Sequence, residues 1–265
     1  MGFEEISKIK NEAEQVNAIY ELFDEDSRLN HSKAARVEFL TTVRAIEACL
    51  RPGDRILDIG AGAGEYSLHF ARKGHEVCAV ELAEANIAAF RRKISGEDRL
   101  ELRQGNALDL GFYPDESFDI VMLFGPLYHL HDPADREKAI KEAMRVCKAE
   151  GKLFFAFITN DMVILTEFCY NSRYFLDGDY DKASFRLHDF PFVFASIDRA
   201  REMLCECGVK IVREIAADGV SELLQDKINA MDEESYGQYL RYHYYISEKP
   251  EMLGMTNHLL IVGEK

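Results

Sequence analysis

The sequence predicts an α/β fold with a doubly wound, mostly parallel sheet. Short apolar runs rich in branched residues, typical of buried parallel strands, alternate along the chain with stretches of helical spacing. A glycine-rich turn, Gly60 to Gly64, follows the first of these runs and leads into a helical stretch. With 265 residues, 47% of them hydrophobic, the chain is long enough for one domain of this class with additions.

The first unit of this fold is a strand, a glycine turn and a helix. The strand covers 56–59, and Gly60 and Gly62 lack a Cβ, so the backbone after the strand can turn sharply and direct N–H groups at a ligand. The next strand, 76–80, ends at Glu81, whose carboxylate is placed to accept hydrogen bonds from both ribose hydroxyls. This order predicts a nucleoside site, with a tight turn between packed elements as the alternative without function.

Asp58 separates two classes of nucleotide. A carboxylate beside the turn would repel a pyrophosphate but attract a cationic amino-acid tail. The turn also reads Gly-Ala-Gly-Ala-Gly and lacks the G-x-G-x-x-G spacing of nicotinamide sites. Both observations favour a nucleoside joined to an amino acid.

The segment from Asp58 to Gly64, together with Glu81, resembles the glycine motif of the class I S-adenosylmethionine-dependent methyltransferases. The resemblance implies a seven-stranded sheet with an antiparallel last strand. It also implies that S-adenosyl-L-methionine is the donor and S-adenosyl-L-homocysteine the product. The donor site would be formed by Asp58, Gly60, Ala61, Gly62, Glu81, Leu82, Asn106, Ala107 and Phe124.

The other segments with which this family binds the donor follow in the same order along the chain. A strand at 100–104 leads into Gly105-Asn106-Ala107-Leu108-Asp109, which resembles the family's adenine-contacting G-D-A-x-D segment. Asn106 replaces the usual Asp there. Its amide carbonyl can accept a hydrogen bond from the adenine amino group, although Asn is also a common turn residue that stabilises a bend. A strand at 118–124, a helix at 133–147 and a strand at 151–158 complete the donor-binding half, 51–158.

The loop after the fourth strand holds the candidate catalytic residues. A sulfonium methyl is already electrophilic, so in-line SN2 displacement requires chiefly alignment and exclusion of water, and no metal. His129 and His131 are candidates for removing a proton from the acceptor, and Tyr128 for orienting it. The alternative is a structural role, in which a histidine caps the next helix or satisfies backbone groups.

Three additions surround this core within a single domain, 1–265. An N-terminal helical cap, 1–50, is expected over the cofactor mouth, as in related enzymes, where Tyr20, Arg28 and His31 could face the donor or substrate. Packing is the alternative for Tyr20 and solvent exposure for Arg28.

The other two additions lie towards the C-terminus. The aromatic-rich insertion 159–195 is predicted to form a lid that carries His188, or else a satellite core. The C-terminal half, 196–265, contains a helix at 197–207, a strand at 210–214, a helical insertion at 220–250 and a last strand at 258–263. The tyrosines of the helical insertion could line a pocket or an oligomer contact, although packing is favoured.

Composition limits the partners. A net charge of −15 argues against nucleic acid and favours a small acceptor, conceivably a cationic one. The six cysteines are scattered without zinc spacing. The absence of a signal sequence and of a long apolar run predicts a cytoplasmic protein that is not in a membrane.

The predicted function is therefore methyl transfer from S-adenosylmethionine to nitrogen, oxygen or sulfur of a small-molecule acceptor. The alternatives are a methyltransferase acting on tRNA or protein, a NAD-dependent oxidoreductase, and a non-catalytic protein that retains the donor fold.

Overall fold

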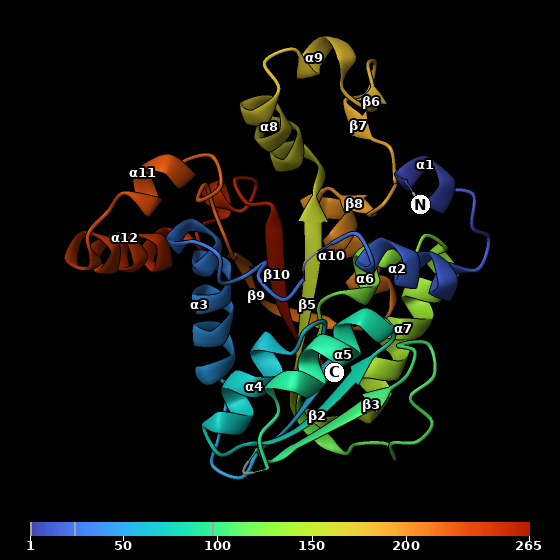
Figure 1. Ribbon diagram of the computed structural model, residues 1–265. Coiled ribbons are helices and arrows are strands. Elements are labelled where there is room, and N and C mark those ends of the chain that lie inside the picture. The colour runs from blue at the N-terminus through green and yellow to red at the C-terminus, as the bar shows by residue number, and fades with distance from the viewer. Residues whose placement is uncertain (1, 24, 97) are drawn as a thin grey trace.

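The computed structural model describes residues 2–23, 25–96 and 98–265. A twisted sheet lies at its centre between two layers of helices (Figure 1). In the part of the chain that the structure describes, seven strands lie side by side in the order β3-β2-β1-β4-β5-β10-β9, and a short strand, β8, pairs beside the end of β5. The strands are β1 (Arg55–Ile59), β2 (Glu76–Glu81), β3 (Leu100–Gln104), β4 (Phe118–Leu123), β5 (Cys147–Thr159), β8 (Phe194–Ala195), β9 (Lys210–Ala216) and β10 (His258–Glu264).

The strand directions confirm the predicted fold class. Strands β1 to β5 are parallel to their neighbours, whereas β10 runs antiparallel to both β5 and β9. Because parallel strands end at the same edge of a sheet, the turns after β1, β2, β3 and β4 meet at one edge, where ligands bind in open α/β sheets.

Helices cover both faces of the sheet. On one face lie α3 (Lys33–Glu47), α4 (Glu65–Arg72) and α5 (Glu84–Lys93), and on the other α7 (Pro133–Val146) and α10 (Ile197–Glu206) (Figure 1). The alternation of strand side chains explains this arrangement, because successive residues point to opposite faces. Ile56 packs with the α3 and α4 side chains, and the next residue, Leu57, packs with those of α7 and α10.

The chain after β4 differs from expectation in two places. Residues predicted as a loop contain a one-turn helix, α6 (Pro126–His129). Strand β5 begins at Cys147 instead of at residue 151. Cys147 lies opposite Phe118 while Lys152 lies opposite Ile120, so the residues between them bulge out of the ladder. Gly151, where the strand was expected to begin, therefore lies in a bulge within a longer strand.

The additions gather mostly at the carboxyl edge of the sheet. The N-terminal helix α2 (Glu12–Tyr20) lies beside α6, α1 (Phe3–Ile6) lies above α2, and the insertion after β5 rises above that strand (Figure 1). This insertion contains α8 (Asn160–Tyr170), α9 (Tyr174–Asp177) and the hairpin of β6 (Tyr180–Asp181) and β7 (Arg186–Leu187).

The third addition packs beside α3. It contains α11 (Gln225–Asn229), α12 (Glu233–Ile246) and the 3₁₀ turn η1 (Pro250–Met252). Ile228 and Tyr236 are buried against Val37 of α3, so this addition extends the core along that helix. No helix among the described residues is long and apolar enough to cross a membrane.

Candidate active site

The glycine turn between β1 and α4 forms the floor of the site. Gly60, Gly62 and Gly64 all have positive φ, between 56° and 86°, a conformation that costs other residues free energy. A Cβ at Gly60 would lie 2.5 Å from Cδ of Pro126, and one at Gly64 would lie 2.3 Å from the ring of Phe90. The turn is therefore both conformationally restricted to glycine and closely packed.

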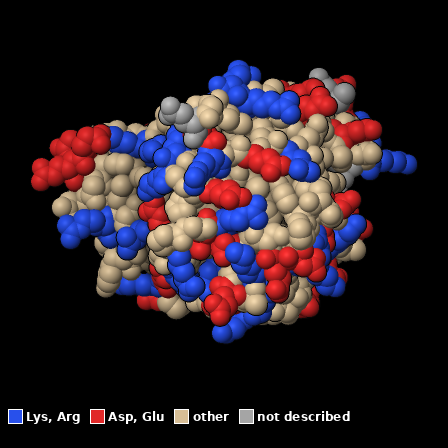
Figure 2. Space-filling model, turned by 90° about the horizontal axis from the view of Figure 1, so that it is seen from below, with Lys and Arg blue, Asp and Glu red and all other residues tan. Residues whose placement is uncertain are grey.

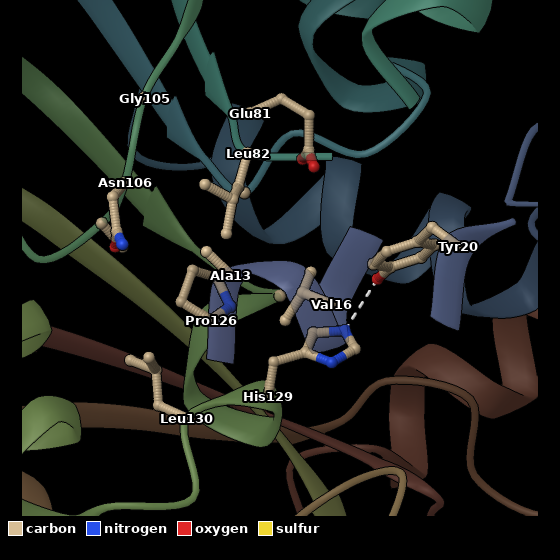
Figure 3. Close-up of a pocket in the computed structure, with 13 residues that line it drawn as sticks. Ala13, Val16, Tyr20, Glu81, Leu82, Gly105, Asn106, Pro126, His129 and Leu130 are labelled. Carbon is tan, nitrogen blue, oxygen red and sulfur yellow. Dashed lines mark hydrogen bonds between the residues drawn. The ribbon is translucent and has the colours of Figure 1, made fainter. Parts of the chain in front are cut away.

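A first cavity lies over this turn and is enclosed by the ends of β1, β2 and β3 together with α2 and α6 (Figure 3). Among the predicted donor residues, Gly60, Glu81, Leu82, Asn106 and Ala107 line this cavity. The structure therefore brings together three segments that are separate in the sequence: the glycine turn, the acid at the end of β2 and the segment after β3. A mostly apolar recess with a few polar groups is the usual character of a small-molecule site.

The polar groups of this cavity are already held in place. One carboxylate oxygen of Glu81 accepts from the backbone N–H of Gly62 at 2.8 Å, and the other accepts from that of Ala83 at 2.8 Å. The amide oxygen of Asn106 accepts from the N–H of Leu108 at 2.9 Å, so this side chain stabilises the turn while it also lines the cavity. Figure 3 shows Glu81 and Asn106 on either side of Leu82.

A second cavity adjoins the first and holds the remaining part of the glycine turn. Tyr20, Gly60 and Gly125 line both cavities, while Asp58 and Phe124 line only the second. Two cavities that share a wall at the turn fit a donor with two ends, a nucleoside on the Glu81 side and an amino-acid tail on the Asp58 side.

Asp58 is almost fully buried and accepts a hydrogen bond from Oγ of Ser67 at 2.6 Å. Burial raises the pKa of this carboxyl to about 7; the nearby Glu81 carboxylate adds to the rise, and the hydrogen bond from Ser67 opposes it. A cationic group in the second cavity would favour the charged form of Asp58.

Tyr20 and His129 meet across the mouth of the first cavity. The Tyr20 hydroxyl on α2 lies 2.8 Å from Nε2 of His129 on α6 (Figure 3). Burial lowers the pKa of the His129 imidazole to about 3. Nδ1 of His129 is buried and has no hydrogen-bond partner among the described residues. This imidazole is therefore neutral at ordinary pH, which argues against storage of an abstracted proton on it.

Tyr128 and Arg28 lie on the far side of the second cavity. The Tyr128 ring contacts that of Phe192 in the insertion, with centroids 5.9 Å apart. The Arg28 guanidinium donates to Glu25 at 2.9 Å and to Glu38 at 2.8 Å. Tyr20 and Arg28, both N-terminal candidates, therefore line the second cavity. His31 lines a more distant cavity beyond Arg28.

Two of the predicted site residues lie away from the donor cavities. His131 is not among the residues that line them; its ring stacks on Phe190 of the insertion, with centroids 6.4 Å apart. His188 is 60% exposed and pairs with Asp179 on the outside of the insertion. The two histidines therefore lie outside the donor cavities, and each contacts a residue of the insertion.

Several lining residues escaped the sequence prediction. Ala13 and Val16 of α2 form one wall of the first cavity, and Pro126 and Leu130 flank His129. The helical stripe that contains Val16 and Tyr20 was visible in the sequence, but it did not show which surface this stripe covers. A cluster beyond Arg28 also went unpredicted: Glu38, Asp218 and His258 each place one ligand atom within 4.8 Å of the others, so they could hold a metal ion.

Comparison with known proteins agrees with this geometry. Residues 57–155 match a family described as a methyltransferase domain. A demethylmenaquinone methyltransferase of Clavibacter sepedonicus is 35% identical over 114 residues, which cover 43% of this chain and 44% of the relative. A ubiquinone biosynthesis O-methyltransferase of Hahella chejuensis is 27% identical over 158 residues, or 59% of this chain and 63% of the relative. The chain thus spans less than two thirds of the length of these curated relatives.

Solved structures share the fold over most of the chain. An S-adenosylmethionine-dependent methyltransferase of Methanosarcina mazei has a TM-score of 0.55 at 20% identity, covering 83% of this chain and 96% of that one. Another, of Thermotoga maritima, has a TM-score of 0.56 at 20% identity and covers 96% and 97%. Residues 57–155 therefore match the methyltransferase domain family, and the chain shares the class I, Rossmann-like fold of S-adenosylmethionine-dependent methyltransferases.

Proposed function

We propose that this protein transfers a methyl group from S-adenosylmethionine to nitrogen, oxygen or sulfur of a small molecule by in-line displacement. One observation carries the proposal: the cavity of Glu81 and Asn106 adjoins the cavity of Asp58, and Gly60 lines both. A nucleoside with an amino-acid tail has this same division into a neutral ring system and a charged end.

The residues present fit such a donor. Glu81 offers carboxylate oxygens for ribose hydroxyls, Asn106 offers an amide for the adenine edge, and Asp58 offers a negative charge for the ammonium of the tail. The absence of a Cβ at Gly60 lets Pro126 of α6 pack against the turn and complete the wall of the first cavity, since a side chain there would collide with Pro126. When bound, the donor supplies an electrophilic methyl on a sulfonium.

The side chains of the protein would position the two reactants and exclude water from the site. Tyr20 and His129 close the mouth of the first cavity through their hydrogen bond, and the rings of Phe124 and Tyr66 meet edge to face beside the second, with centroids 5.2 Å apart. A closed, mostly apolar cleft excludes water and holds both reactants near the geometry of attack. Tyr128, at the boundary of the second cavity, is placed to orient the acceptor.

The neutral state of His129 bears on proton removal. An imidazole whose pKa lies near 3 does not retain a proton at neutral pH. The proton of an acceptor would then leave to solvent before the acceptor enters, or another group would take it, while His129 holds Tyr20 in place.

A small acceptor is favoured over a macromolecule. The relatives from C. sepedonicus and H. chejuensis are named for quinone methylation, which is chemistry on small molecules. On the face at the amino ends of the strands, which lies opposite the site, acidic and basic side chains of the described residues are interspersed (Figure 2), so this face offers no continuous basic surface to a phosphate backbone.

Calorimetric titration with S-adenosylhomocysteine and with NADH tests the donor. We expect one equivalent of S-adenosylhomocysteine to bind and NADH not to bind. Binding of NADH without the adenosyl ligand would identify the rival oxidoreductase. Transfer of labelled methyl from S-adenosylmethionine to a panel of small molecules and to bulk tRNA then tests the acceptor class. Donor binding without transfer to any of them would favour a non-catalytic role.

A further inference from the structure

Two more cavities continue from the donor cleft towards α3 and the third addition. The nearer one is lined by Arg28, Tyr66, Phe124 and Tyr128, which also line the Asp58 side of the donor cleft, and by His258. The farther one shares Arg28, Glu38 and His258 with the nearer. The four cavities therefore follow one another from the adenosine side of the cleft to the space between α3, α8 and the residues after β9.

The wall of the farther cavity comes mainly from the additions, not from the common core. Tyr170 is the last residue of α8, and Glu222 and Gln225 belong to the segment after β9. The Tyr170 hydroxyl donates to Glu222 at 3.0 Å and accepts from Gln225 at 2.8 Å. This cavity has a volume of about 270 Å³, near the lower end of the range for small-molecule sites.

The two cationic groups of this cavity are already matched by carboxylates. Arg28 pairs with Glu38 at 2.8 Å, and Nδ1 of His258 lies 2.9 Å from Asp218 and 3.3 Å from Glu38. Arg28 also pairs with Glu25 at 2.9 Å, so both cations already have carboxylate partners and neither is left for an anionic ligand.

Glu222 is the exception. It accepts hydrogen bonds from two neutral groups, the Tyr170 hydroxyl at 3.0 Å and the Asn257 amide at 2.7 Å. Within the described residues it forms no ion pair, although it is only partly exposed. Burial raises the pKa of this carboxyl and the Asp218 charge adds to the rise, while the His258 charge and the two hydrogen bonds oppose it. A half-buried carboxylate without an ion-pair partner gains most from a ligand that brings a cation.

We propose that the cavity beyond Arg28 is the acceptor site, and that Glu222 selects a small molecule with an ammonium group at one end. The proposal rests on the proposed methyl transfer. With the ammonium held at Glu222, the other end of the acceptor extends past Arg28 towards Tyr128 and the donor. A lone pair there attacks the methyl carbon, the carbon–sulfur bond breaks with its electron pair going to sulfur, and any proton on the attacking atom passes to water.

The test uses 2-phenylethylamine as the cationic probe and 2-phenylethanol as its neutral counterpart. Both are titrated into the full-length protein saturated with S-adenosylhomocysteine, and binding is followed by ligand-observed NMR. We expect the amine to bind about tenfold more tightly than the alcohol, the scale of one charge-assisted hydrogen bond. Equal affinity of the two probes for the wild-type protein would overturn the proposal.

Substitution assigns the preference to one residue. Glu222→Gln is expected to reduce the amine preference to within about twofold, because it removes the charge and keeps the side-chain shape. Glu234→Gln removes an equal charge from the exposed start of α12 and is expected to preserve the preference. Tyr170→Phe, which leaves the Glu222 charge in place, should also preserve it. A preference that survives Glu222→Gln would refute the role of this carboxylate.

The outcomes separate this inference from the proposed function. Failure of S-adenosylhomocysteine to bind would remove the proposed function itself. Binding of S-adenosylhomocysteine without an amine preference would leave methyl transfer intact and remove only the cationic acceptor.

Discussion

The Tyr20 hydroxyl on α2 lies 2.8 Å from Nε2 of His129 on α6, and this contact joins an N-terminal helix to the loop after β4. Burial raises the pKa of Tyr20 well above its usual value and lowers that of His129 to about 3. Both groups are therefore neutral, and the tautomer of the imidazole sets which of the two donates. The contact depends on two neutral groups, so it should be insensitive to pH across the physiological range.

This pairing predicts a neutral His129. We expect nitrogen-15 NMR of imidazole-labelled protein to show a His129 signal that remains neutral from pH 5 to pH 8. The His129→Gln variant identifies the signal by its loss. A His129 signal that titrates near the usual histidine pKa of about 6.5 would show that the imidazole is more accessible than in this structure.

The Glu81 carboxylate is expected to contribute strongly to donor affinity. Replacing Glu81 by Ala should weaken binding of S-adenosylhomocysteine by about 1.5–3 kcal/mol, the scale of hydrogen bonds to a charged group. Glu84→Ala, at the exposed start of α5, is the matched control and should bind as the wild type does. Unchanged calorimetric affinity of the Glu81 variant would remove the ribose role from this residue.

Asp58 should make donor binding depend on pH. The pKa of this carboxyl is raised to about 7 in the free protein, so it is mostly protonated at lower pH and must lose its proton to attract the ammonium of the donor. We expect the affinity for S-adenosylhomocysteine to fall about tenfold for each pH unit below 7 and to level off above it.

The same shift has a consequence for the unliganded protein. A carboxyl whose folded pKa is raised contributes stability below its usual pKa and loses it as pH rises through the folded value, here about 7. Asp58→Asn should abolish both effects, as measured by calorimetry and by urea unfolding between pH 5 and 8. Equal donor affinity at pH 5.5 and 8 in the wild type would contradict the raised pKa.

Gly64 and Gly74 separate backbone strain from packing. Both have positive φ, 86° and 92°, but a Cβ at Gly64 would lie 2.3 Å from the Phe90 ring while one at Gly74 would meet nothing within 4 Å. Gly74→Ala should cost about 1–2 kcal/mol of unfolding free energy from conformation alone. Gly64→Ala should cost about 2–5 kcal/mol because overpacking is added. Equal losses in urea unfolding would show that Phe90 moves aside without cost.

The parts of the fold predicted well are those in which the signal is local. The glycine turn follows β1 directly, and Glu81 is the last residue of the next strand, β2, so each signal lies within or beside a single element. The start of β5 was placed too late because its limit is set by a distant partner: Cys147 pairs with Phe118, and Gly151 then bulges out of the ladder. A pattern within a few residues does not indicate which distant residue a strand will pair with.

Some residues of the candidate site could likewise be predicted from the sequence, whereas others could be placed only by the structure. Asp58, Glu81 and Asn106 lie in the cleft because parallel strands bring their carboxyl ends to one edge. The histidines after β4 were equivalent in the sequence, yet the structure places His129 in the cleft and His131 against Phe190. Both rings contact the aromatic insertion, His129 at Phe192 and His131 at Phe190, so the sequence alone could not separate them.

The sequence by itself determined the donor-binding half of this protein, since the chemistry of that half is written in short segments joined by regular crossovers. Only the tertiary structure brought Arg28, Glu38, Asp218, Glu222 and His258 around one cavity. These side chains come from separate segments, and their meeting depends on how the additions pack against α3 and β10. Packing of this kind buries apolar surface without a local signature, so the acceptor side emerges only once the chain is folded.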